Sequence, residues 1–574
     1  MIGNHLPLAN LHIADISVIA LYLLGVTFIG IWSARQIKTS ADFFLPHRFG
    51  KIMMIMFSFG TGTHSDHAVS VSAKSFTNGL SGIWYQWLWL PVTPFYWLIA
   101  PVFRRFRAIT TSDIFESRFS PSVGILFAVV GVLNLTFNIG VMLKGSSALV
   151  SASTGDFISA NLATVMLTVI FVIYGVAGGL GAAIVTDLIQ GILTIIFSVL
   201  LLPLILNAVG GFAVMREKIA DPKMFSLVAP GEIGFFYVAV IAFNALVGVM
   251  TQPQALSHCA AGKTEAEGRI GFMGGTLIKR FCTIPWCLTG VAAVVYFAGK
   301  DIHPDRVFGT IAGDFLPKLM PGVLGVFIAG VLGAVMSSCD AFMIASSALF
   351  TENVYKRLIC DKDDRHYIAV GRIAAVGIVG GGVAFAFWLP DVVTGLEIFW
   401  KISPMMGIAL WLGLFWRRMT PCGAWAATLT AFGIWFLTTQ PAFIDFIGGI
   451  PGSEAMRFVI VKDSVPEIYL PWQMLFYLTG GTLAAIVVSL LTRPVPEEQL
   501  DNFYALVRTP IQPGEKETAP CTLPEGVVVP EKRKLLPFKN LEILVPSRIS
   551  VIGFLVGWVC VAAIVYAVYL IASG

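Results

Sequence analysis

The chain has 574 residues, of which 56% are hydrophobic and only 13% are charged, and its formal net charge is +4. A soluble domain carries about 25% charged residues, so the composition excludes an ordinary soluble protein. Its basic residues sit in short loops rather than in a basic domain, which argues against nucleic-acid binding. Many apolar runs reach about 20 residues, the length that crosses a hydrocarbon core of about 30 Å. The sequence therefore predicts an all-α, polytopic membrane protein.

Apolar runs between charged or Pro/Gly-rich breaks predict about fourteen membrane spans. The first run, 12–34, has full spanning length and no basic segment before it, which indicates an extra N-terminal membrane helix rather than a cleavable signal peptide. The longest polar stretch, 493–546, is rich in proline and predicts a cytoplasmic loop before the last span, 547–571. The expected spans are 12–34, 52–74, 80–103, 121–150, 160–178, 182–207, 234–257, 270–298, 321–354, 368–388, 391–416, 421–440, 470–492 and 547–571.

Lysines and arginines gather in alternate loops between these spans. Cytoplasmic loops of membrane proteins are enriched in lysine and arginine, so the basic loops are predicted to be cytoplasmic. An even number of spans then places both chain termini outside. The basic residues of these loops are Arg35, Lys38, Arg48, Lys51, Arg104, Arg105, Arg107, Arg118, Lys263, Arg269, Lys356, Arg357, Lys362, Arg365, Arg417 and Arg418.

Two spans carry interruptions at matching positions. The second span contains a polar, glycine-rich run over 57–67, and the seventh dissolves into polar residues between Asn244 and Pro253. Interrupted helices in matching places of two five-helix halves are typical of inverted-repeat transporters, here 52–207 and 234–416, followed by two further helices within 421–492. A glycine-rich packing face is the alternative, although it would leave His64, Asp66 and His67 unexplained.

Three segments resemble the sodium:solute symporter family. They are Lys38–Leu45, Tyr174–Gln190, and Gly333–Ser338 followed by 351–355. The resemblance runs from about residue 12 to residue 416, and more loosely to Arg508. It implies a LeuT-type core of ten helices in two inverted repeats, with extra helices at either end.

The resemblance also implies a sodium site between the first and eighth core helices. Carbonyl oxygens from an unwound helix and hydroxyls from a packed neighbour form a suitable nest for the ion. A serine pair in a membrane helix could instead bond back to its own helix carbonyls. The residues matched to the sodium site are Gly60, Thr63, Ala334, Ser337 and Ser338.

Two acidic residues within spans are candidates for ion binding. Asp187 matches the family's acid near the cytoplasmic end of the sodium path, and its alternative is a helix N-cap after the Gly178-Gly179 break. Asp340 is a candidate second ion site or proton site. Acids within a span are expensive, so a function is the default hypothesis for each.

Candidate solute contacts lie near the two interruptions and among the intramembrane cations. His67 and Gln86 fall where the galactose-carrying members hold sugar hydroxyls, and Val247 falls near their tyrosine gate, so a hexose is disfavoured. Three potential ligands close together could bind zinc, but their spacing matches no strong motif, so we expect hydrogen bonds to the solute or a structural polar cluster. The substrate-binding candidates are His64, Asp66, His67, Gln86, Asn244, Lys279 and Arg280.

The charge of the solute depends on how the intramembrane cations are paired. Lys279 and Arg280 point about 100° apart on a helix, so at most one of them is expected to line the cavity. A net cationic cavity favours an anionic solute, but pairing Lys144 or Lys401 with Asp340 would cancel that charge. Polyols, amino acids and nucleosides remain alternatives.

The sequence thus predicts a sodium-coupled symporter, not an enzyme. It would import a small organic solute across the plasma (inner) membrane by alternating access, with Na+ as the coupling ion. No other metal or cofactor and no required protein partner are expected. The alternatives are a proton-coupled symporter of the same fold and a transporter-like membrane sensor.

Overall fold

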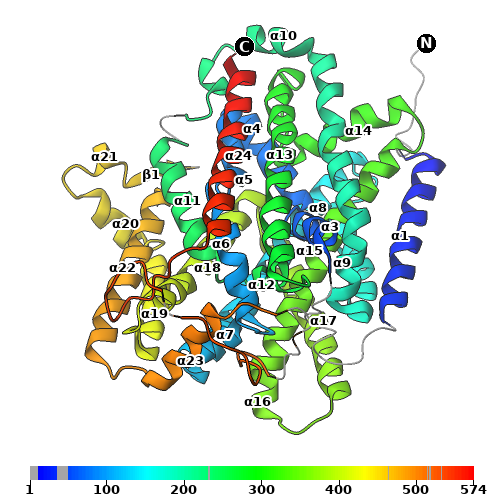
Figure 1. Ribbon diagram of the computed structural model, residues 1–574. Coiled ribbons are helices and arrows are strands. Elements are labelled where there is room, and N and C mark those ends of the chain that lie inside the picture. The colour runs from blue at the N-terminus through cyan, green and yellow to red at the C-terminus, as the bar shows by residue number, and fades with distance from the viewer. Residues whose placement is uncertain are drawn as a thin grey trace, which may run out of the picture.

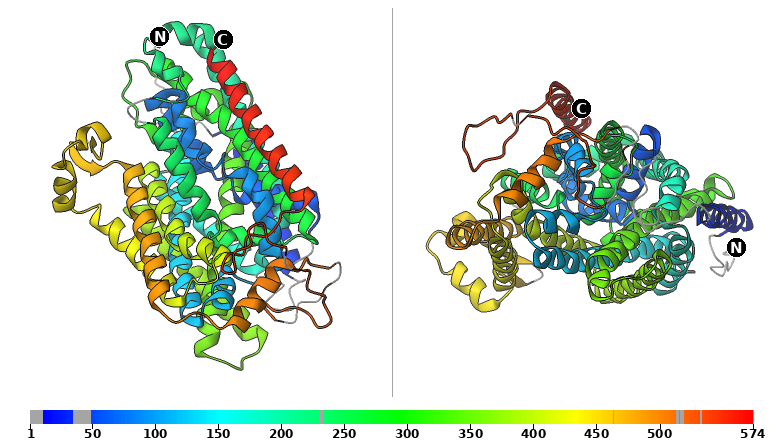
Figure 2. Two further views of the ribbon diagram at one scale, coloured as in Figure 1. Left: turned by 60° about the vertical axis from the view of Figure 1, so that its left-hand side comes forward. Right: turned by 60° about the horizontal axis from the view of Figure 1, so that its bottom comes forward.

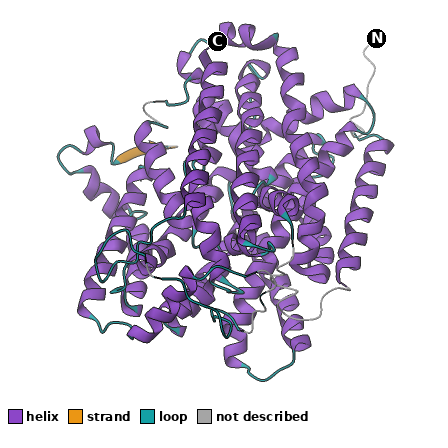
Figure 3. Ribbon diagram, in the orientation of Figure 1, coloured by secondary structure: helices purple, strands orange, loops and turns teal. Residues whose placement is uncertain are grey.

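The computed structural model describes residues 11–34, 49–229, 233–462, 464–512, 515, 519–531 and 533–573. Nearly all of the regular structure is helical, and the long helices run side by side in one bundle (Figures 1 and 3). The all-α membrane architecture is confirmed. Among the described residues, eight helices are long and apolar enough to span a membrane, or up to ten if each bent pair is one span, so the total of fourteen stays a prediction.

The first repeat begins with a broken helix, as predicted. α3 (Lys51–Thr61) ends within the bundle and α4 (Ser65–Asn78) begins three residues later. The extra helix α1 (Ile13–Ala34) packs on α9 and α15 at the side of the bundle. The remaining elements of this half are η1 (Gly79–Ile83), α5 (Trp84–Trp87), α6 (Thr93–Arg105), α7 (Thr111–Arg118), α8 (Pro121–Ser153), α9 (Ala160–Val209), α10 (Gly211–Lys218) and η2 (Pro222–Phe225).

α9 includes both of the spans predicted at 160–178 and 182–207. Its backbone stays helical over 50 residues, across Gly178 and Gly179. Glycine is common in membrane helices, where it does not force a break. The alternative interpretation of Asp187 as a helix N-cap is therefore wrong, because Asp187 lies inside α9.

The second repeat also opens on a broken helix. α11 (Phe235–Val249) and α12 (Pro253–Ala260) are bent by 69° at a short break. Pro253 stands at the start of α12, a position where its missing N–H needs no partner. The other elements are α13 (Glu265–Tyr296), η3 (Pro304–Arg306), α14 (Val307–Leu319), α15 (Val323–Phe350), the π-helical turn η4 (Thr351–Tyr355), α16 (Lys356–Leu358), α17 (Asp364–Trp388) and α18 (Val392–Phe415).

The C-terminal part adds helices to one flank of the core. A segment that includes a short hairpin projects from the bundle (Figure 2). The stretch predicted as a polar loop contains α23, which packs against α6 and α7. The elements are α19 (Pro421–Leu437), α20 (Pro441–Gly448), α21 (Ser453–Met456), β1 (Val459–Lys462), β2 (Val465–Ile468), α22 (Leu470–Leu491), α23 (Glu497–Arg508) and α24 (Arg548–Ser573).

Ion pairs join several basic loops at one end of the bundle. Arg105 pairs with Glu265 at 2.8 Å, and Arg107 pairs with Glu515 at 2.5 Å. Arg357 of α16 pairs with Glu116 of α7. α7, α16 and α23 all lie at the lower end of Figure 1, whereas α10 and the end of α24 lie at the upper end. The positive-inside rule therefore predicts that the lower end is cytoplasmic.

The first broken helix lies inside the bundle, and its neighbours approach it closely. α13 packs along α3 and α4, while α15 packs on α8 and α9. A Cβ on Gly275 of α13 would lie 2.6 Å from the Ile55 carbonyl oxygen of α3. Glycine is therefore required where α13 crosses α3, just below the break.

Candidate sodium and solute sites

The break between α3 and α4 is a short, buried turn. The N–H of Thr63 donates to the Gly60 carbonyl at 3.0 Å. The N–H of Gly62 donates to the same oxygen. Unwound backbone at membrane depth is stable only where protein or a cavity surrounds it, and both conditions hold here, since His64 and Gly62 line a cavity.

Four of the five residues matched to a sodium site, Gly60, Ala334, Ser337 and Ser338, meet where α3 crosses α15. The hydroxyl of Ser338 donates to the Gly60 carbonyl at 3.3 Å and to the Ala334 carbonyl at 3.1 Å. A Cβ on Gly60 would lie 2.9 Å from the Ser337 hydroxyl, so this oxygen faces the break as well. Thr63 is fully buried, and its hydroxyl finds no hydrogen-bond partner in the described part of the chain. The contact with Ala334 is the back-bond that a purely structural serine would make, while the contact with Gly60 links the two helices.

Asp187 lies beside this junction. The Thr61 hydroxyl donates to Asp187 Oδ2 at 3.3 Å, and a Cβ on Gly60 would lie 3.5 Å from Asp187 Cγ. The side chain is fully buried inside α9 rather than at a helix start. A carboxylate thus stands next to the serine pair and the Gly60 carbonyl, an arrangement of oxygens suited to a cation.

Asp340 lies three residues after Ser337 on α15. It is fully buried, and neither carboxylate oxygen has a hydrogen-bond partner among the described residues. A Cβ on Gly175 of α9 would contact Asp340 Oδ1, so the side chain lies against α9. A buried carboxylate without a partner is costly unless it is protonated or beside a cation.

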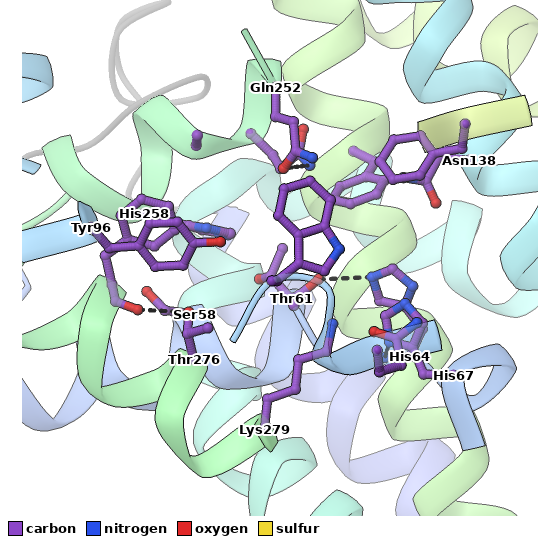
Figure 4. A pocket seen from close by; sticks show the side chains of 18 of the residues that line it. Ser58, Thr61, His64, His67, Tyr96, Asn138, Gln252, His258, Thr276 and Lys279 are labelled. Atoms are coloured by element: carbon purple, nitrogen blue, oxygen red, sulfur yellow. Dashed lines mark hydrogen bonds between the residues drawn. The ribbon is translucent and has the colours of Figure 1, made fainter. Parts of the chain in front are cut away.

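A cavity of about 80 Å³ adjoins the break (Figure 4). Residues from α3, α4, α5, α6, α8, α12, α13, α15 and α18 surround it. The lining includes Ser58, Thr61, His64, His67, Gln86, Trp89, Tyr96, Asn138, Gln252, Gln254, His258, Thr276, Lys279, Arg280, Phe342, Phe399 and Trp400.

Five of the seven predicted solute-binding residues line this cavity, and two do not. Asp66 is fully buried behind the cavity wall. Asn244 donates to the Trp400 carbonyl at 2.9 Å and accepts from the Tyr477 hydroxyl at 2.5 Å, so it joins α11 to α18 and α22. Sequence reasoning missed Gln254 and His258, which follow the second interruption within α12. Polar residues placed directly after a helix break were the signal for both.

Both Lys279 and Arg280 line the cavity, contrary to the expectation that at most one would. Their Cα–Cβ bonds point about 100° apart on α13, but the two long side chains reach the same cavity. Arg280 Nη1 donates to the Gln86 carbonyl at 2.6 Å, and the guanidinium is in hydrogen-bond reach of Tyr96. The amine of Lys279 has no hydrogen bond or ion pair to any residue that the structure describes, whereas its backbone carbonyl accepts a bond from the Thr283 hydroxyl.

The His64, Asp66 and His67 side chains form a compact cluster. His64 Nδ1 lies 3.3 Å from Asp66 Oδ1, and His67 Nε2 lies 3.9 Å from Asp66 Oδ2. Their ligand atoms lie within 4.8 Å of one another. However, His67 Nδ1 accepts the backbone N–H of His64 at 3.2 Å, which leaves the proton on His67 Nε2. A protonated nitrogen cannot bind a metal, so the geometry disfavours zinc and favours hydrogen bonding.

A second, larger space of about 1140 Å³ lies on the side away from the cytoplasmic loops. Tyr85 stands on its floor, donates to Glu397 Oε1 at 2.9 Å, and packs on Trp400, which lines the smaller cavity. Lys401 also faces this vestibule, within electrostatic reach of Glu397 and not of Asp340. Lys144 lies close to Asp305 instead. The pairing with Asp340 that would cancel the cationic charge is therefore not formed by either lysine.

Comparisons with known proteins agree with this architecture. Residues 43–431 match the model of the sodium:solute symporter family. The Haemophilus influenzae sodium/pantothenate symporter is 26% identical over 431 residues, which cover 70% of this chain and 86% of that protein. The rabbit (Oryctolagus cuniculus) sodium/glucose cotransporter 1 is 23% identical and covers 85% of this chain and 80% of its own length.

The fold is shared with solved transporter structures. A Na+-coupled sialic acid symporter in an outward-open state matches with a TM-score of 0.67 at 19% identity, over 84% of this chain and 99% of that one. A nucleobase-cation-symport-1 family transporter matches with a TM-score of 0.52 at 12% identity, and the match covers 81% of this chain and 99% of that one. The LeuT-type fold is confirmed. The segment Lys38–Leu45, one of the three that carried the resemblance, lies outside the described residues. The family match covers more than half of the chain. The chain therefore belongs to the sodium:solute symporter family, whose members are transporters rather than enzymes.

Proposed function

We propose that this protein imports a small organic solute across the plasma membrane, coupled to Na+, by alternating access. The observation that carries the proposal is the junction of α3, α9 and α15. There the Gly60 carbonyl, the hydroxyls of Ser337 and Ser338, and the Asp187 carboxylate converge beside a polar cavity. Sodium bound at this junction would hold the broken helix in the form that the solute recognises.

The two spaces fit an outward-facing form of such a transporter. The wide vestibule opens away from the cytoplasmic loops, and the small cavity lies below Tyr85 and Trp400. Ion pairs join the loops at the opposite end. Opening those pairs while closing the vestibule would release the solute inward.

Sodium coupling supplies enough free energy for accumulation. One Na+ gains about 2.3 kcal/mol per 100 mV and about 1.4 kcal/mol per tenfold concentration gradient. The sum, about 3.7 kcal/mol, concentrates a neutral solute several hundredfold.

The solute itself is proposed to be anionic. Lys279 and Arg280 line the cavity, and Asp340 neutralises neither. The expectation against a hexose rests on His67 and Gln86, which occupy the lining where a glutamine and a glutamate hold sugar hydroxyls in the galactose-carrying members.

Thermal unfolding of the purified protein tests the sodium site without knowledge of the solute. A ligand at about 100 times its Kd adds about 2.7 kcal/mol to stability. We expect sodium, compared with equal potassium, to raise the midpoint of the wild type and not of the Ser337→Ala/Ser338→Ala double variant. An equal rise of the midpoint in both proteins would show that sodium does not bind at this junction.

A second ion site at Asp340 is a separate proposal. Its buried, unpartnered carboxylate lies on the same helix as the serine pair and supports a second cation or a proton. Sodium-binding stoichiometry, measured by equilibrium dialysis with ²²Na, is expected to fall in Asp340→Asn. An unchanged stoichiometry, together with uptake that depends on pH but not on sodium, would favour proton coupling.

A further inference from the structure

Lys279 is a buried cation that lacks a partner in the described part of the protein. Its side chain is 92% buried, since its relative exposure is 8%. Figure 4 shows its amine pointing toward the centre of the cavity, between Thr61 and His64. A lone lysine at membrane depth is unfavourable and usually marks a functional site. The neighbouring Arg280 differs because the Gln86 carbonyl holds its guanidinium against α5.

The charges around the cavity leave room for one anion. Two basic side chains of α13, Lys279 and Arg280, line the cavity, and one acidic side chain, Asp66, lies behind the wall within electrostatic reach of Lys279. Asp66 already faces both histidines, at 3.3 and 3.9 Å. The distance from His67 Nε2 to Asp66 is too long for a hydrogen bond, so this N–H is free to donate to a solute oxygen near Lys279.

Elsewhere on the wall, two amide oxygens need hydrogen-bond donors. Gln86 Oε1 and Gln254 Oε1 are buried and have no partner among the described residues. Both line the cavity. A buried acceptor left unsatisfied costs about 1–3 kcal/mol, so the solute is expected to carry hydroxyl groups that donate to them. An ammonium group fits less well, because these acceptors are neutral and the cavity already carries excess positive charge.

The size of the cavity limits the solute in this conformation. A cavity needs at least about 10–15 Å³ to admit one water molecule. The volume of about 80 Å³ therefore has room for only a few water molecules. That space suits a compact molecule rather than a long chain.

We propose that Lys279 binds the carboxylate of a compact hydroxymonocarboxylic acid, whose hydroxyl groups donate to Gln86 and Gln254. This inference rests on the proposed symport function and assigns its solute class. His67 would donate a second hydrogen bond to the carboxylate. The apolar faces of Phe342 and Phe399 would enclose the carbon chain.

The test follows thermal unfolding of the full-length protein in sodium buffer, with and without each probe. The acids are glycolate, glycerate, threonate and gluconate, and the comparison compounds are glyceramide, propionate and serine. At least one hydroxy acid is expected to raise the midpoint, with glyceramide, propionate and serine binding at least tenfold more weakly than the best acid. Stronger binding by serine, propionate or a neutral compound would overturn the proposal, as would the absence of any response to all four acids.

Variants locate the binding to named side chains. Lys279→Gln is expected to weaken hydroxy-acid binding about 10- to 100-fold, the loss typical of one hydrogen bond to a charged group, and Lys279→Arg to recover part of it. Lys74→Gln, which changes a lysine of the vestibule instead, should bind as the wild type does. Gln254→Leu should reduce the preference for glycerate over propionate. Full binding by Lys279→Gln would overturn the assignment.

The sodium response in the same samples separates the two proposals. If sodium stabilises the wild type and Lys279→Gln but no hydroxy acid binds, the solute class is wrong and the sodium site stands. If sodium itself has no effect on the thermal midpoint of the wild type, the proposed sodium-coupled function is wrong, whatever the solute class.

Discussion

The sodium junction can be perturbed by adding one methyl group at Gly60. A Cβ at this position would lie 2.9 Å from the Ser337 hydroxyl oxygen and 3.5 Å from Asp187 Cγ. The second contact is an ordinary van der Waals distance, so only the hydroxyl must move. A serine hydroxyl can rotate to another staggered position, and Gly60→Ala should therefore fold but turn Ser337 away from the ion.

The expected magnitude follows from the loss of one oxygen ligand. Taking a hydrogen bond to a charged group as the guide, this loss is about 1.5–3 kcal/mol, or about 10- to 150-fold in the sodium Kd. At a concentration of 100 times the wild-type Kd, a 100-fold weaker site would reduce sodium stabilisation from about 2.7 to about 0.4 kcal/mol. Stability in potassium should fall by only about 1 kcal/mol, the lower end for an overpacked site.

A double-mutant cycle decides whether Ser337 transmits the effect. We would measure thermal midpoints over a sodium titration for Gly60→Ala, Ser337→Ala and the double variant. If the methyl group acts by displacing the hydroxyl, the double variant binds sodium about as well as Ser337→Ala alone. Additive losses would refute this reasoning. Gly274→Ala is the control, because its Cβ would meet only Ile55 side-chain carbons, at 3.6 and 3.9 Å.

Three further predictions concern contacts away from the sodium junction. Arg118 is fully buried and donates to the carbonyls of Gly413 and Trp416, at the end of α18, at 2.7 and 3.0 Å. Arg118→Met should therefore lower the free energy of unfolding by about 3–6 kcal/mol, as measured by thermal unfolding. Arg533 is exposed, so Arg533→Met should leave that free energy unchanged. The guanidinium of Arg306, 2.8 Å from Asp156, lowers the pKa of that carboxyl. The resulting stabilisation is present above the unfolded pKa of about 3.9 and is lost as the pH falls through the lower folded value. The midpoints of the wild type and Arg306→Gln should therefore differ at pH 6, begin to converge below about pH 4, and become equal only below the folded pKa of Asp156. Tyr477→Phe removes the hydroxyl that donates to Asn244 Oδ1 of α11 at 2.5 Å, and it should lower the free energy of unfolding by about 1–3 kcal/mol. An unchanged thermal midpoint would mean that this hydrogen bond does not contribute to stability.

The broken helices could be predicted because their local chemistry is unusual. Glycine and polar residues around Gly60 and Pro253 are poor choices for a lipid-facing helix. The serine pair could be placed opposite the first break by the resemblance alone, and the structure does bring Ser338 to Gly60. The continuity of α9 could not be predicted, because glycine permits a break without requiring one.

The lining of the cavity was harder to predict. The angle between successive residues of a helix predicts the direction of each Cβ, but it does not predict how far a long side chain reaches. Lys279 and Arg280 both line the cavity because their side chains are long enough to reach it from different directions. Asn244 looked like a solute ligand because it is polar and near a break, yet it bonds to Trp400 and Tyr477. Such pairings join residues more than 150 positions apart in the chain, and one sequence holds no record of them.

The wide vestibule has an electrical consequence. A space of about 1140 Å³ can hold many waters, and water conducts the outside potential down to its floor at Tyr85. The membrane voltage then falls mainly across the protein between that floor and the cytoplasmic loops. Sodium arriving from outside would cross little of the field before it binds, while the inward transition would carry its charge through most of it. Voltage should therefore accelerate the inward step, at up to about 2.3 kcal/mol per 100 mV, and change sodium affinity from outside only slightly.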